Sequence, residues 1–157
     1  MEGSCNRHSG MAVSQEHPLG CAVACVAFRL GIPYADALAC FSTRKNAWTR
    51  GFFCAEVVAA LDRAGLRYAW ETFDPAKHER VIEKNGTIVF IDPCEAYPSG
   101  HYLIRSAYGW MNPWANFPLM IPAEAGFQEM LPGKIVYVIF ESISLPLASS
   151  VFPLPRG

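Results

Sequence analysis

The stretch QEHPLGCAVACVA, residues 15–27, decides the fold, and the rest of the chain is organised around it. After a Pro–Leu–Gly break it continues as an almost wholly apolar run from Cys21 to Leu30, closed by a glycine. Such a run, with glycine on both sides, predicts a short buried helix over about 21–31, central because Arg29 is its one charged residue. Cys21 would lie in the first turn, where free backbone N–H groups and the helix dipole favour a reactive thiolate.

Outward from this helix, the chain reads as helices followed by strands. Proline at the first turn and glycine after the end predict the helices, and β-branched or aromatic alternation predicts the strands. The expected helices cover about 33–41 and 54–64, and the expected strands cover 67–73, 87–91, 101–107, 108–114 and 135–140. The segments read as irregular are 1–14, the loop 42–53, a turn at 78–83, the long connection 115–134 and the proline-rich tail 141–157. This order predicts a single α+β domain over 1–157, with N-terminal helices packed on a mostly antiparallel sheet.

Composition narrows the class of protein. The 157 residues are 52% hydrophobic and 17% charged, which is typical of a well-packed globule. The net charge of −1 and the lack of a Lys/Arg run argue against a nucleic-acid partner. No apolar run is long enough to span a membrane, and the polar start MEGSCNRHSG lacks the apolar core of a secretory signal. These features predict a cytoplasmic protein without a membrane span, and its oligomeric state stays open.

The six cysteines and four histidines predict neither a metal site nor a cofactor. The chain has no CxxC pair, and its histidines are scattered along the sequence. Several cysteines lie inside apolar helical runs, and no secretory signal precedes them. We therefore expect free thiols in a reducing compartment.

Cysteine-based acyl chemistry needs a thiolate, a histidine, a group that orients the histidine, and donors for an oxyanion. Cys21 is the candidate nucleophile, and Cys54 competes because it also opens a helix after a Gly-containing loop. Gln15 separates them, since a glutamine shortly upstream can aim its N–H at the oxyanion beside the backbone N–H of the cysteine. Cys54 has no equivalent upstream, and Cys25, one turn after Cys21, should face inward and be structural.

His101 is the best candidate base, because it follows the Pro–Ser–Gly break and opens the alternating strand HYLIR. His8 and His17 lie near the start in segments that read as flexible, and His78 lies in the charged segment KHER, where it should be solvated. Asn112, in GWMNPW, is the candidate orienting group, although asparagine before proline is also common in turns. Asp92, in FIDPC, is the alternative orienting group.

These residues resemble the signature of the bacteriocin-processing, double-glycine leader peptidases, which are papain-like cysteine peptidases. Gln15 stands six residues before Cys21, which follows Gly20, and Ala24–Cys25 comes next. The helix segment CAEVVAALDRAGL after Gly51, the strand GHYLIR and the segment MNPW are also similar to that family, and the match spans about 13–140. In MNPW, asparagine stands where the family has aspartate. Papain itself uses asparagine in this role.

The resemblance implies a papain-like fold and a cysteine peptidase in which Cys21, His101, Asn112 and Gln15 form the site. It also implies a peptide or protein substrate with small residues, Gly or Ala, before the scissile bond. Gly20 and Ala22 depart from the family's aspartate and glycine, the hairpin is shortened, and the usual membrane transporter is missing from the chain. We therefore expect a free-standing protease or a toxin-like effector, delivered into another cell by a non-classical route.

Two other functions stay open from the sequence. The same acyl-enzyme could serve a side-chain deamidase or an acyltransferase, and the fold could serve as a non-catalytic binding module.

The hairpin geometry is a sharper expectation. With a two-residue turn at Ser106–Ala107, paired positions sum to 213, so His101 would face Asn112 on one side of the sheet.

Overall fold

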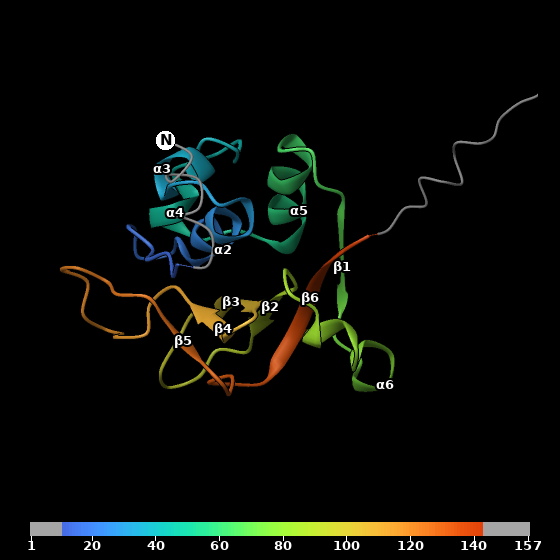
Figure 1. Cartoon of the computed structure of the whole chain (residues 1–157). Coiled ribbons are helices and arrows are strands. Elements are labelled where there is room, and N and C mark those ends of the chain that lie inside the picture. The colour runs from blue at the N-terminus through green and yellow to red at the C-terminus, as the bar shows by residue number, and fades with distance from the viewer. Residues whose placement is uncertain (1–10, 143–157) are drawn as a thin grey trace, which may run out of the picture.

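The computed structural model describes residues 11–142, which form a layer of helices on a six-stranded sheet (Figure 1). The helical elements are α2 (Cys21–Leu30), α3 (Tyr34–Leu38), α4 (Asn46–Thr49), α5 (Cys54–Arg63), α6 (Pro75–His78) and the 3-10 turn η1 (Val81–Glu83). The strands are β1 (Tyr68–Thr72), β2 (Ile88–Ile91), β3 (His101–Ser106), β4 (Gly109–Asn112), β5 (Gly126–Gln128) and β6 (Ile135–Glu141). Most of the expected irregular start, with His8, and all but two residues of the expected tail lie outside the described residues.

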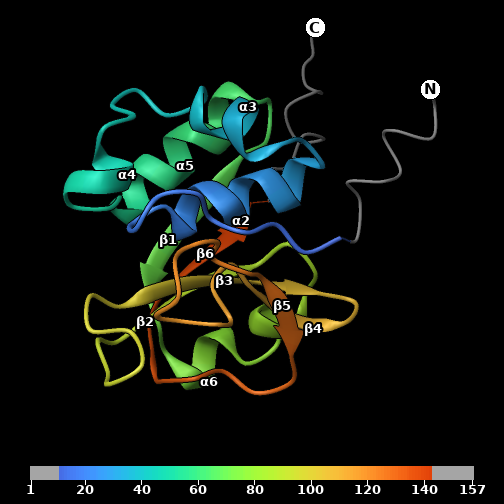
Figure 2. The same ribbon diagram turned by 90° about the vertical axis from the view of Figure 1, so that its left-hand side faces the viewer.

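The sheet has the strand order β1-β6-β2-β3-β4-β5, and every neighbouring pair is antiparallel. Helices α2 to α5 lie over one face of the sheet, and α6 lies on the other side (Figure 2). The α+β class with helices packed on an antiparallel sheet is therefore confirmed. The last strand, β6, lies between β1 and β2 and pairs with both, so it joins β1 to the rest of the sheet.

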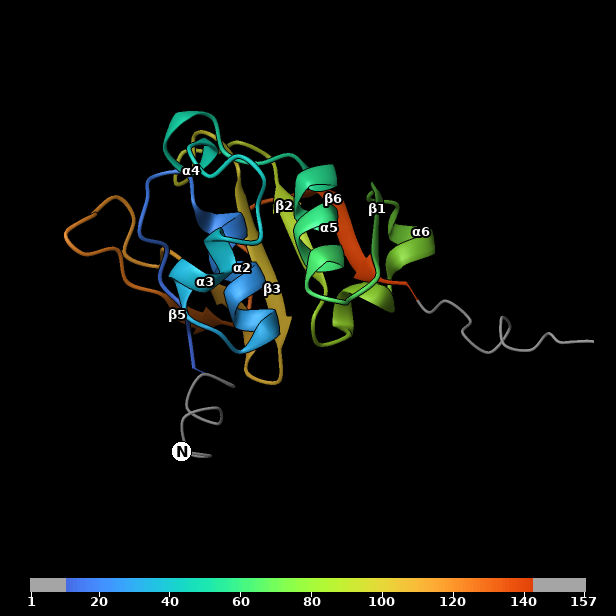
Figure 3. The ribbon, with the colours of Figure 1, turned by 90° about the horizontal axis from the view of Figure 1, so that it is seen from above.

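Helix α2 is the central helix that its sequence predicts. Six of its ten residues are buried, and Gly31 ends it in the left-handed conformation with its N–H donating to the carbonyl of Ala27. Seen from above, α2 runs over β3 (Figure 3), and α2 also packs against α3. This contact brings the start of α2, with Cys21, to the start of β3, with His101.

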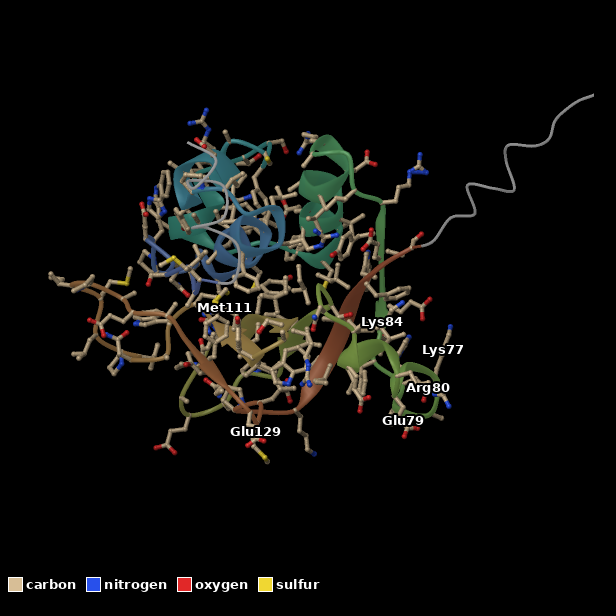
Figure 4. The ribbon with its side chains drawn as sticks, viewed as in Figure 1. Lys77, Glu79, Arg80, Lys84, Met111 and Glu129 are labelled. Atoms are coloured by element: carbon tan, nitrogen blue, oxygen red, sulfur yellow. The ribbon has the colours of Figure 1, made fainter. Side chains whose placement is uncertain are left out.

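The middle of the sheet is covered on both faces by two apolar cores. Ile88, Tyr102 and Ile104 pack with the helices in one core, and Met111 occupies the same interlayer space (Figure 4). A second core lies on the opposite face and is built from Val89, Ile91, Tyr97, Leu103, Trp110 and Val138. Burial on two faces explains why β2 reads as the continuous apolar run IVFI instead of alternating.

Two short elements escape the sequence prediction. Helix α4 interrupts the expected loop 42–53, and strand β5 lies within the expected connection 115–134. They have four and three residues respectively, which is too few for a hydrophobic period to show. Tertiary pairing defines both, since Leu19 N–H donates to the Ala47 carbonyl and β5 pairs with β4.

The predicted turn of the β3–β4 hairpin is wrong by one position. Ser106 pairs with Gly109, so the two-residue turn is Ala107–Tyr108 and paired positions sum to 215. Position 109 requires glycine, because its φ is +101° and a Cβ there would lie 2.7 Å from the Gln128 carbonyl oxygen of β5. The Ser106 hydroxyl accepts from Tyr108 N–H and donates to the Gly109 carbonyl, which fixes the turn.

The expectation that His78 is solvated is also wrong. His78 is 2% exposed, and its ring bonds Asp74 N–H through Nδ1 and the Glu71 carboxylate through Nε2, at 2.9 and 2.8 Å. Its charged neighbours Lys77, Glu79 and Arg80 project outward from α6, as Figure 4 shows, and they give the segment its polar sequence. His78 caps this short helix against the sheet and contributes nothing to the cleft described below.

None of the helices within residues 11–142 has the length and apolar character that crossing a membrane requires.

Candidate active site

Cys21 and His101 line a single cleft at the end of the sheet, with a volume of about 240 Å³. Its lining comes from the start of α2, the loop before α5 and the loop before β3, and it is completed by a side chain of β2 and by the segment after β4. Most of its other walls are apolar or aromatic, formed by Pro18, Leu19, Phe52, Phe53, Phe90, Tyr97, Trp114 and Phe117. Arg50 is the only Lys, Arg, Asp or Glu among the lining residues, and its guanidinium is paired with Glu56.

The Cys21 sulfur lies among backbone amides. Tyr102 N–H donates to Sγ at 3.4 Å, and the N–H groups of Ala22 and of Cys21 itself also point to it from the helix start. Burial raises the pKa of the Cys21 thiol to about 11, while the three amides act in the opposite direction. The resting sulfur is therefore a neutral thiol that is surrounded by donors suited to negative charge.

Tyr34 explains why glycine precedes Cys21. Its hydroxyl bonds His17 Nδ1 at 3.0 Å and occupies the space that a Cβ on Gly20 would need. Backbone N–H groups of Glu16 and His17 also donate to this hydroxyl.

His101 and Asn112 form a buried hydrogen bond, with 2.7 Å between Nε2 and Oδ1. Asn112 Oδ1 also accepts from Trp114 N–H at 3.0 Å, so the oxygen side of the amide faces the imidazole. Nε2 must then carry a proton, and Nδ1 of neutral His101 is left as an acceptor. Burial lowers the pKa of His101 to about 4, against the opposing effect of the Asn112 hydrogen bond.

Tyr97, which the sequence reading missed, contacts both of these residues. Its ring stacks on the His101 imidazole, with centroids 3.9 Å apart and planes 6° apart. Its hydroxyl accepts from Asn112 Nδ2 at 3.0 Å and donates to the Trp114 carbonyl at 2.7 Å. A tyrosine four residues before the candidate histidine was the only available signal, and no spacing rule singles it out.

Gln15 is buried but does not line the cleft. Its Nε2 donates to the carbonyls of His17 and Pro18, at 3.0 and 3.1 Å, and its Oε1 has no partner. Its backbone N–H donates to the Pro113 carbonyl, next to Asn112. In this structure Gln15 braces the loop that leads to Cys21, and donation to an oxyanion would require its side chain to turn.

The competing residues lie in different surroundings. Cys25 is fully buried in the helix-side core, as expected for a structural residue. Cys54 is 6% exposed and its sulfur accepts from the Tyr102 hydroxyl at 3.7 Å. Asp92 is exposed, and the hydrogen-bond partner of the His101 ring is Asn112 instead.

Cys21 and His101 share the cleft without a hydrogen bond between their side chains among the bonds of the described residues. In ligand-free structures such catalytic bonds are often long and tighten only with substrate. The arrangement offers a thiol, a neutral imidazole acceptor, an amide that fixes that imidazole, and backbone donors beside the sulfur. Chemically, this set suits attack on a carbonyl carbon.

Within residues 11–142, no group of three or more His, Cys, Asp or Glu side chains is arranged to hold a metal ion. Comparison with known proteins adds nothing to this description, because no family model, curated protein or solved structure matches the chain.

Proposed function

We propose that this protein is a cysteine peptidase of the papain-like type, in which Cys21 is the nucleophile, His101 the base and Asn112 the orienting residue. One observation carries the proposal: a thiol at a helix start and an asparagine-bonded histidine line one cleft although they are eighty residues apart in sequence. The α+β architecture is compatible with this assignment. The papain-like fold itself is part of the proposal.

In the first half of the reaction, Cys21 Sγ attacks the carbonyl carbon of a peptide bond. The thiol proton passes to His101 Nδ1 as the C–S bond forms, and the carbonyl oxygen becomes an oxyanion. When the C–N bond breaks, His101 gives this proton to the leaving amine, and an acyl-thioester remains on Cys21. A water then attacks the thioester with His101 as base, which releases the new carboxyl end and restores the thiol.

The backbone N–H of Cys21 supplies one donor for the oxyanion under this proposal, and Gln15 supplies a second after its side chain turns. The buried, unpartnered Oε1 of Gln15 is compatible with such a turn, because the present orientation satisfies only the nitrogen side of the amide. Gln15 is therefore the member of the proposed site whose side chain has to change orientation for catalysis.

The walls of the cleft favour an uncharged substrate around the scissile bond. They are mostly aromatic or apolar, and Arg50 is already paired with Glu56 at 2.8 Å. A polypeptide with small residues such as Gly or Ala before the cleaved bond suits this lining. We extend the proposal to a peptide or protein substrate, with the protein acting as a protease or an effector.

A non-catalytic binding module is the second candidate function. It is favoured by the neutral resting site, in which burial raises the pKa of the Cys21 thiol to about 11, and by the inward orientation of the Gln15 amide. Brief labelling with iodoacetamide at pH 7, followed by peptide mapping, separates the two candidates. A fast-reacting Cys21 would mean that His101 takes the thiol proton in spite of burial, which supports the enzyme, and uniformly slow cysteines support the binding module.

Incubation with a proteome, followed by sequencing of newly formed N-termini, tests the peptidase proposal directly. The matched control is Cys21→Ala, which leaves the cleft intact and removes the sulfur. New termini with the wild-type protein alone support hydrolysis of peptide bonds. Intact products with a mass gain of about one dalton, or cross-linked products, would assign the same acyl-enzyme to deamidation or acyl transfer instead.

A further inference from the structure

We propose that Tyr97 is a positioning residue that sets the tautomer of His101, acting through Asn112 together with Gln128. This inference rests on the proposed function, because the tautomer matters only if His101 has to accept the Cys21 proton. It is carried by a set of hydrogen bonds that continues outward from the site and gives each amide a single orientation.

The Asn112 side chain is fixed by partners on both ends. Nδ2 donates to the Tyr97 hydroxyl at 3.0 Å and to Gln128 Oε1 at 2.9 Å, while Oδ1 accepts from Trp114 N–H. Rotating this amide by 180° would place the nitrogen against the Trp114 N–H donor and the oxygen against the Gln128 oxygen. The observed orientation, with oxygen toward His101, is therefore the one that the partners permit.

The partners are themselves oriented. The Tyr97 hydroxyl donates to the Trp114 carbonyl at 2.7 Å, so it has only a lone pair to offer Asn112. Gln128 Nε2 donates to the Met130 carbonyl at 2.8 Å, which turns its Oε1 toward Asn112. Both acceptors thus point at the NH₂ group of Asn112. This leaves Asn112 Oδ1 facing His101, so the Nε2 atom of His101 has to carry the proton.

The ring of Tyr97 adds a second constraint. It lies flat on the imidazole, at 3.9 Å between centroids, and it is 6% exposed. Its backbone is held in place because Cys94 N–H and Gly100 N–H both donate to the Tyr97 carbonyl. The stack restrains the imidazole from tilting out of the plane of its bond to Asn112.

The experiment uses full-length protein labelled with ¹⁵N-histidine and long-range ¹H–¹⁵N correlation between pH 5 and 8. Wild-type His101 should show the neutral Nε2–H tautomer throughout. Tyr97→Phe keeps the stack and removes the hydroxyl, so the Nδ1–H tautomer should become populated. With a substrate in hand, kcat should fall by about fivefold to tenfold, the value of one hydrogen bond, with KM unchanged.

Tyr68→Phe is the matched control, because Tyr68 is also 6% exposed. Its hydroxyl bonds Arg29 and the Gly86 carbonyl, and none of these three residues lines the cleft. It should leave the His101 tautomer and kcat unchanged. Gln128→Met removes the other acceptor of Asn112 and provides a second variant in case Tyr97→Phe fails to fold. It should shift the tautomer in the same direction as Tyr97→Phe.

The outcomes separate this inference from the peptidase proposal, since the tautomer is observed without substrate. An unchanged Nε2–H tautomer in both Tyr97→Phe and Gln128→Met overturns the positioning role, even in an active enzyme. A shifted tautomer combined with a wild-type protein that cleaves nothing supports the positioning contact and overturns the proposed function.

Discussion

Asn112 lies two positions along the sheet from the place directly opposite His101, yet its Oδ1 is 2.7 Å from His101 Nε2. The register Ile104↔Met111 gives a sum of 215, which places Asn112 level with Leu103. Residues two apart on a strand share a face, so the imidazole and the amide meet on a diagonal. The expected contact between His101 and Asn112 is therefore present even though the strand pairing differs from the expected one by two residues.

Cys21→Ala should abolish turnover and leave folding nearly unchanged, because Cys21 is only partly buried at the edge of the cleft. Cys54→Ala should keep activity, since the Cys54 sulfur bonds the Tyr102 hydroxyl and does not line the cleft. Both variants should be assayed for proteome cleavage beside thermal unfolding. Loss of activity in Cys54→Ala with retention in Cys21→Ala would show that the nucleophile is misassigned.

Asn112→Ala should lower kcat without eliminating it and should also reduce the free energy of unfolding. The truncation leaves Trp114 N–H and Gln128 Oε1 without their partner, which costs about 1–3 kcal/mol for a buried polar group. Urea titration measures the loss of stability, and kcat is measured well below the unfolding midpoint. An Asn112→Ala variant with wild-type kcat would remove this residue from the proposed site.

Gln15→Ala distinguishes bracing from oxyanion binding. Loss of the two side-chain bonds to His17 and Pro18 carbonyls should lower the free energy of unfolding by about 1–3 kcal/mol. Loss of an oxyanion donor should in addition lower kcat by about 10²–10³. Both are measured on the folded variant at low temperature, with iodoacetamide labelling of Cys21 as the check that the thiol is intact. A stability loss at unchanged kcat would leave Gln15 with the bracing role alone.

Folding stability should fall on the acid side because His101 is buried neutral. Burial lowers the pKa of His101 from 6.5 to about 4, so between these values the unfolded chain binds the proton that the folded protein refuses. Stability is then full above pH 6.5 and declines as the pH falls to 4, by about 3 kcal/mol. Urea titrations at several pH values measure this slope, and His101→Gln should flatten it. An equal slope in that variant would assign the acid sensitivity to other groups.

Gly20→Ala should destabilise the protein by about 1–3 kcal/mol, the usual cost of overpacking, because the new Cβ meets the Tyr34 hydroxyl. Tyr34→Phe in the same chain removes that oxygen and should recover part of the loss. A double-mutant cycle of unfolding free energies measures the coupling between the two positions. Strictly additive effects would mean that the hydroxyl is not what excludes a side chain at residue 20.

Much of the fold follows from local sequence pattern. The apolar run bounded by glycines defines α2, and the alternating HYLIR segment defines β3. Elements that form only through contacts with distant parts of the chain, such as α4 and β5, cannot be predicted from local sequence pattern. His78 was misread for the same reason, because its burial comes from Glu71 and from the sheet, and its charged neighbours in sequence point the other way.

The candidate site divides in a similar way. Cys21, His101 and Asn112 could be proposed from residue type and position, and they come together at one end of the sheet. Tyr97 and Gln128 could not, because their contribution lies in the orientation of hydrogen bonds across three loops and strands. Gln15 was assigned by spacing, and spacing does not determine the direction in which an amide points.

The insertion of β6 between β1 and β2 has a consequence for biosynthesis. A growing chain can form the helices and the β2–β3–β4 hairpins early, but β2 and β1 keep open edges until residues 135–141 have left the ribosome. Such non-local pairing forms late, and unpaired edges attract other chains. The nascent protein therefore passes through a stage in which the proposed catalytic residues are present before the sheet that positions them is complete.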